Sequence, residues 1–145
     1  NTFEGQAALY LETLASTTVT TSRYPVRWNK STLDVKHLVT VILRDIAQKK
    51  PRAGIAYKFH AYLADVVYHI SSVTGFNRIA FSGGVFQTAL LVDLLMNRFK
   101  ASNHQLFFHR ELSPNDENIS FGQLTVARVK NELEHYLDDE LVNNL

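Results

Sequence analysis

The sequence has no cysteine, which excludes disulfides and cysteine-ligated metal sites. No apolar run approaches the ~20 residues that a membrane-spanning helix needs, so we expect no membrane partner. An excess of one charge is also missing, because 15 basic and 14 acidic side chains leave a net charge of +1. This balance gives no electrostatic reason to expect a nucleic-acid partner.

Length and apolar content indicate a folded protein. The chain has 145 residues, of which 46% are hydrophobic, and this composition is typical of one globular domain rather than a disordered segment. It begins at Asn1, without an initiator methionine and without the basic and apolar regions of a signal peptide. We therefore expect a cytoplasmic piece of a larger protein.

Apolar spacing predicts several helices. We expect them over residues 4–16, from Ser31 to about Lys50, over residues 55–73 with Gly75 as the cap, and from residue 119 onward. Ser31–Asp34 resembles a capping box that would begin the second helix. The third helix is expected to face the core with Ile55, Phe59, Leu63, Val66, Ile70 and Val73.

Two short apolar runs, Ile79–Phe81 and Gln105–His109, predict strands that flank another helix. A strand, a helix and a strand in this order form a βαβ unit with parallel strands. The expected fold class is therefore α/β, helix-rich with a short, mostly parallel sheet. So few strands would leave exposed edges, so we expect further strands on chain that is absent here.

The expected organisation has three segments within one domain or subdomain. Residues 1–76 form a mainly helical segment. Residues 77–137 carry the strand, glycine turn, helix, strand and last helix. Residues 138–145 form a frayed tail.

The chain is organised around Ile79–Thr88, which reads as a strand, a two-glycine turn and the start of a helix. Gly83 and Gly84 permit a sharp turn and a close approach of a ligand to the backbone. A helix N-terminus beyond them would favour a phosphate or another anion. The alternative is that the glycine pair is only a turn.

Asp116 lies in a turn cluster after the second strand. Ligands of open α/β sheets bind beyond the carboxyl ends of the strands, so Asp116 and the glycine turn together suggest a metal–nucleotide site. Alternatively, Asp116 caps the last helix or closes an Asx turn. Ser82 lacks the glycine spacing of a nucleophile elbow. Among the histidines, we single out His109 as a candidate functional residue, because it ends the second strand.

Three segments in this order resemble the C-terminal half of the last domain of the HypF-type hydrogenase-maturation carbamoyltransferases. They are Phe3–Ala8, Phe81–Gln87 and Ser113–Asp116, the last followed by Ile119–Gln123. Lys58-Phe59-His60 also resembles that family, and the resemblance covers nearly the whole chain.

The resemblance implies the duplicated, ribonuclease-H-like fold of actin, Hsp70 and sugar kinases, similar to the protein that attaches threonylcarbamoyl groups to tRNA. It implies use of carbamoyl-adenylate, made from carbamoyl phosphate and ATP upstream. The carbamoyl group would pass to the C-terminal cysteine of the partner HypE during maturation of nickel–iron hydrogenases. The other implied partner is the remainder of the carbamoyltransferase chain, without which this piece is expected to be inactive.

The resemblance also implies roles for particular residues. The implied nucleotide-binding residues are Glu4, Gly5, Ser82, Gly83, Gly84 and Thr88. Asp116 would be a ligand of a divalent metal (Mg, Fe or Zn), whose histidine ligands in the family lie upstream of the Glu-Gly-Gln motif. Those histidines are absent here, so the metal site is expected to be incomplete.

Two positions depart from the family. Thr88 stands where the family usually has Asn, and Glu117-Asn118 stands where it usually has Gly-Gly. Thr offers one hydroxyl in place of an amide, which weakens or replaces a nucleotide contact. These departures would be signs of the first alternative, a docking or scaffold module without turnover. A second alternative, independent of them, is a relative that carbamoylates a small-molecule hydroxyl.

Overall fold

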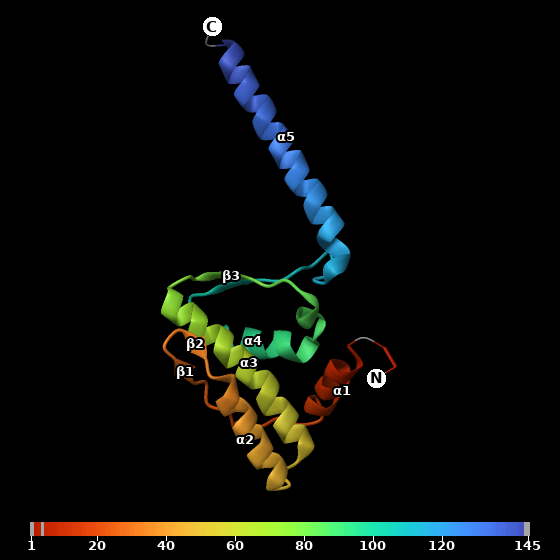
Figure 1. Cartoon of the computed structure of the whole chain (residues 1–145), viewed down its shortest axis with the longest axis vertical. Helices are drawn as coiled ribbons and strands as arrows, with labels where there is room; N and C mark the ends of the chain where they lie inside the picture. The colour runs from red at the N-terminus through yellow and green to blue at the C-terminus, as the bar shows by residue number, and fades with distance from the viewer. Residues whose placement is uncertain (1, 4, 144–145) are drawn as a thin grey trace. The chain divides into compact units, whose positions relative to one another are not determined.

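The computed structural model describes residues 2–3 and 5–143, with side chains as far as Asn131. Its elements in chain order (Figure 1) are α1 (Gln6–Ala15), β1 (Trp28–Asn29), β2 (Thr32–Leu33), α2 (Val35–Ala47), α3 (Arg52–Thr74), β3 (Arg78–Ala80), the 3₁₀ helix η1 (Gly84–Gln87), α4 (Ala89–Phe99), β4 (Gln105–Phe107), the 3₁₀ helix η2 (Asp116–Asn118) and α5 (Ile119–Asn143). In these ranges, no helix combines the length and the apolar character needed to cross a membrane.

Packing divides the chain into two compact units. The first unit comprises Asn1–Phe81 and Thr88–Phe107, and the second comprises Ser82–Gln87 and Phe108–Leu145. The three sequence segments expected above, with boundaries after residues 76 and 137, stay predictions. The backbone of α5 is helical to Asn143, and residues 144–145 of the expected frayed tail lie outside the described residues.

Helix α3 is the centre of the first unit and contacts α1, α2 and α4 (Figure 1). Its buried residues are Ala56, Tyr57, His60, Ala61, Tyr62, Ala64 and Ser71. Three of these are alanines, whose small side chains let neighbouring helices approach closely.

The expected inward face of α3 was therefore partly wrong. Phe59 and Leu63 are only half-buried, against the core cluster around Tyr24 and Tyr62. Val73 is 73% exposed. The helix is apolar on more than one side, so the large residues alone did not identify its most buried face.

The βαβ expectation is confirmed within the first unit. Strands β3 and β4 are parallel, with Ile79 opposite Leu106. The helix between them, α4, buries Leu91, Leu94, Leu95 and Phe99. The expected cap Gly75 ends α3 in a left-handed conformation.

The start of α2 differs from the expectation. The helix begins at Val35, and its cap is Asp34, whose carboxylate accepts the N–H of His37 at 3.0 Å. Ser31 is not the cap, because the chain before Asp34 forms an antiparallel hairpin that pairs Trp28 with Leu33. Each strand of this hairpin has two residues, too few to give a periodic signal.

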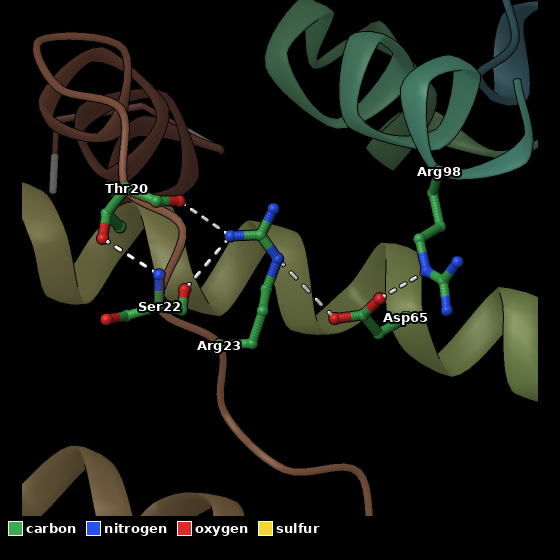
Figure 2. Close-up of polar contacts among 5 residues, drawn as sticks. All are labelled: Thr20, Ser22, Arg23, Asp65 and Arg98. Atoms are coloured by element: carbon green, nitrogen blue, oxygen red, sulfur yellow. Dashed lines mark hydrogen bonds and ion pairs between the residues drawn. The ribbon is translucent and has the colours of Figure 1, made fainter.

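Figure 2 shows an ion-pair cluster that ties the loop before β1 to α3 and α4. Asp65 accepts from Arg98 Nε at 2.6 Å and pairs with Arg23 Nε at 3.8 Å. Arg23 Nη1 also donates to the carbonyls of Thr20 and Ser22, at 2.7 and 3.1 Å. Both arginine side chains are 41% exposed, so each pair contributes modestly to stability.

Candidate functional site

The second unit contains the two-glycine turn. Gly83 has a φ of 108°, a conformation that residues with a Cβ rarely adopt. Its N–H donates to the carbonyl of Pro114 at 2.6 Å. The turn is thus fixed against the segment that carries the Ser113–Asn118 cluster.

Three further contacts join the same two segments. Gln87 Nε2 donates to Ser113 Oγ at 3.2 Å, and the rings of Phe86 and Phe108 meet edge to face with centroids 6.5 Å apart. His109 Nε2 lies 3.3 Å from Ser82 Oγ. We call the two joined segments, Ser82–Gln87 and Phe108–Asn118, the glycine-turn site.

Gly84 is not required by the packing of this unit. A Cβ built at Gly84 would meet only the Cβ of Asn115, at 3.9 Å, which is an ordinary contact. Gly84 is exposed, and a side chain at this position would fit without a clash among the described residues. This openness fits a backbone that a ligand approaches closely.

The capping role considered for Asp116 belongs to its neighbour. Asn115 Oδ1 accepts the N–H of Glu117 at 3.2 Å and caps η2. The carboxylate of Asp116 is exposed and makes no hydrogen bond or ion pair with the part of the chain that the structure describes. It is therefore open to an external ligand.

A metal fits this site only in part. Among the residues described, no three His, Cys, Asp or Glu side chains come together as a metal cluster. Asp116 offers one carboxylate, so a metal would need its other ligands from outside these residues. We therefore assign no chemical step to a metal.

The helix after the turn starts later than the sequence indicated. The 3₁₀ helix η1 follows Gly83 directly, and α4 begins only at Ala89 in the first unit. The N–H of Leu90 in the first turn of α4 donates to Glu12 Oε1 at 3.1 Å. A carboxylate of this chain thus occupies a donor that was expected to face a ligand anion.

The structure brings together only some of the expected site residues. The second unit contains Ser82, Gly83, Gly84 and Asp116. Thr88 and Gly5 belong to the first unit, where they precede α4 and α1 without a side-chain capping bond. Glu4 lies outside the described residues.

Sequence reasoning missed some of the residues that hold the site. The carbonyl of Pro114 and the Gln87–Ser113 pair were not identified, and His109 was noted without a role. The available signal was the parallel pairing of the two strands, because segments that follow parallel strands leave at the same edge of a sheet.

Comparison with known proteins identifies the family. The profile described as "Carbamoyltransferase, Kae1-like Domain, second subdomain" matches residues 1–123. The chain is 34% identical over 127 residues to the carbamoyltransferase HypF of a Synechocystis species. This match covers 85% of this chain and 16% of that protein. It is 25% identical over 134 residues to the probable carbamoyltransferase HypF of Methanocaldococcus jannaschii, covering 90% of this chain and 18% of that protein.

Solved structures give the same likeness. Full-length HypF in a phosphate- and nucleotide-bound form superposes with a TM-score of 0.76 at 28% identity, over 88% of this chain and 21% of that one. HypF of T. kodakarensis superposes with a TM-score of 0.72 at 26% identity, over 90% of this chain and 17% of that one. The chain thus spans less than a fifth of the length of the curated relatives.

The expected helix-rich α/β subdomain with a small parallel sheet is confirmed by these likenesses and by the β3–β4 pair. The profile covers every element from α1 to η2 and the start of α5. The chain belongs to the HypF carbamoyltransferase family, as the second subdomain of its Kae1-like domain.

Proposed function

We propose that this chain supplies the phosphate-side half of the nucleotide site of a HypF-type carbamoyltransferase. The full-length protein would take carbamoyl-adenylate, made from carbamoyl phosphate and ATP, and carbamoylate the C-terminal cysteine of a HypE-type acceptor. The acceptor sulfur would form a bond to the carbamoyl carbon, the bond from that carbon to the phosphate oxygen would break, and AMP and the thiol proton would leave. The chain alone is expected to be inactive.

The observation that carries this proposal is the glycine-turn site. Gly83 is held in a conformation suited to glycine, and Gly84 is open although the packing does not demand it. The Ser82 hydroxyl and the Asp116 carboxylate belong to the same compact unit and are both exposed. Backbone without side chains, next to a hydroxyl, suits close approach of a phosphate.

The two departures from the family are compatible with this role. Asp116, Glu117 and Asn118 form a regular 3₁₀ helix capped by Asn115, so the local backbone accommodates the replacement of two glycines. The hydroxyl of Thr88 makes no capping bond, which leaves it available to a ligand.

Asp116 is proposed as one ligand of a divalent metal (Mg, Fe or Zn), with the other ligands on the remainder of the protein. A single exposed carboxylate that is unpaired among the described residues is suitable as one ligand of a hard cation. This part of the proposal can be tested by substitution.

The test is transfer of labelled carbamoyl from the full-length protein to a HypE-type peptide that ends in cysteine. Asp116→Ala should lower transfer by at least about 10- to 100-fold, because that is already the usual effect of losing a group that only supports a metal ligand. Asp93→Ala, which removes an exposed carboxylate from α4 in the other unit, is the matched control.

Normal transfer by Asp116→Ala would remove Asp116 from the set of required residues. Absence of transfer by the unsubstituted protein, with carbamoyl-adenylate supplied, would instead support a scaffold module. Transfer to small-molecule hydroxyls but not to the peptide would support the remaining alternative.

A further inference from the structure

In the second unit, the side chain of His109 directly contacts Ser82, an expected nucleotide-binding residue. Its Nε2 lies 3.3 Å from Ser82 Oγ, and both side chains are exposed. The other contacts between the two segments of the glycine-turn site are made by backbone, amide, hydroxyl and aromatic groups. Those contacts join the two segments without involving His109 or the Ser82 side chain.

We propose that His109 is a positioning residue of the nucleotide site. With its proton on Nε2, the imidazole donates to Ser82 Oγ, and the hydroxyl proton of Ser82 is then free to donate to a phosphate oxygen over the glycine turn. A hydroxyl is both donor and acceptor, so the group that occupies its lone pair decides where its proton points. This inference rests on the proposed nucleotide site.

The hydrogen bonds of the glycine-turn site favour this role. Ser82 directly precedes Gly83, whose N–H is already used by Pro114 at 2.6 Å. The turn's first N–H is therefore not available to a phosphate, and the neighbouring hydroxyl is the side-chain donor that remains beside it. A donor whose direction is fixed before binding loses less entropy on binding than a free rotor.

The experiment is a calorimetric titration of the full-length protein with ADP and Mg²⁺. Ser82→Ala should weaken ADP binding by about 10- to 100-fold, the usual effect of one lost hydrogen bond to a charged group. His109→Ala, which removes a hydrogen bond within the protein, should weaken it by about 2- to 10-fold. The double variant should be no weaker than Ser82→Ala alone, because His109 acts through Ser82.

Two conservative variants distinguish a role of the Nε2 hydrogen bond from a role of side-chain volume alone. His109→Gln places an amide N–H at about the reach of Nε2 and should restore most of the affinity, whereas His109→Asn ends one bond shorter and should not. His69→Gln, an exposed histidine on α3 in the other unit, should bind as the unsubstituted protein does. Thermal unfolding temperatures of all variants should agree within a few degrees.

The outcomes separate this inference from the function on which it rests. If the unsubstituted protein binds ADP and His109→Ala binds equally well, or the two single effects add in the double variant, the positioning role is wrong and the nucleotide site stands. If the unsubstituted protein does not bind ADP, the nucleotide site and the role of His109 are both refuted.

Discussion

At the scale of single residues, Gly83 and Gly84 allow a matched comparison, because only Gly83 has a backbone conformation that favours glycine. Gly83→Ala places a Cβ on a backbone with a φ of 108°, which should cost about 1–2 kcal/mol of unfolding free energy. Gly84→Ala meets only Asn115 Cβ at 3.9 Å and should change stability by less than about 0.5 kcal/mol. Chemical denaturation of both variants measures the difference, and equal losses would show that the turn does not hold the conformation described.

Asp45 is a buried carboxylate in the first unit. It accepts from Tyr24 Oη at 2.9 Å and pairs with Lys50 at 2.7 Å and with Lys58. Burial by itself raises the pKa of Asp45, but the hydrogen bonds from Lys50, Lys58 and Tyr24 outweigh it and hold the pKa well below its ordinary value. Burial, followed by the bond to Asp45, raises the pKa of Tyr24.

A lowered pKa in the folded state makes stability depend on pH in the acid range. The contribution of Asp45 is present above its ordinary pKa of about 4 and is lost as pH falls through its lower folded value. Asp45→Asn should therefore cost about 3 kcal/mol at pH 7, and the difference from the unsubstituted protein should shrink between pH 4 and acid unfolding. Tyr24→Phe, which removes one hydrogen bond to this carboxylate, should cost about 1.5–3 kcal/mol. A difference for Asp45→Asn that stays constant down to pH 2 would contradict this assignment.

At the scale of elements, α1 and α4 are linked by a side chain at a helix end. Glu12 on α1 accepts the N–H of Leu90 near the start of α4, and Thr88 supplies no side-chain cap of its own. Glu12→Ala should cost about 1 kcal/mol and increase hydrogen exchange at the Leu90 amide, because the donor loses its acceptor. Glu12→Gln keeps an acceptor and should cost less. Unchanged exchange at Leu90 in Glu12→Ala would show that the contact does not form in solution.

The elements that sequence could predict are those with a strong periodic signal. The parallel β3–β4 pair and the helix α4 between the two strands followed from apolar runs and chain order. The two-residue strands of the β1–β2 hairpin gave no such signal, so the beginning of α2 was placed too early. The buried face of α3 was missed in part because it is lined by alanines, which hydrophobic periodicity weights lightly.

The candidate site also has features that the sequence could predict and features that it could not. The glycine turn and Asp116 were found because glycine pairs and turn clusters are local patterns. The cross-segment contacts of Pro114 and Gln87 join residues about 26 to 31 positions apart and depend on packing that no local pattern specifies. The occupation of Leu90 N–H by Glu12 could not be predicted either, because 78 positions separate the two residues.

At the scale of the whole molecule, the chain is a subdomain of a longer carbamoyltransferase-family protein and holds part of the proposed site. Four of the expected site residues belong to one compact unit, and Thr88 and Gly5 belong to the other. The glycine-turn site in the second unit therefore holds only part of the proposed set of nucleotide-binding residues. This arrangement explains why the chain alone is expected to lack activity.

The most direct measurement is calorimetric titration of the full-length protein with ATP and Mg²⁺, comparing Gly84→Arg with Gly54→Arg. Gly84→Arg fills the open surface of the turn and should remove this nucleotide site, so that only ATP binding by the upstream activating part of the protein remains. Gly54→Arg adds the same side chain to α3, where nothing lies within 4 Å of the new Cβ, and should leave binding unchanged. Equal binding by both variants would contradict the central claim that the glycine turn receives the phosphates.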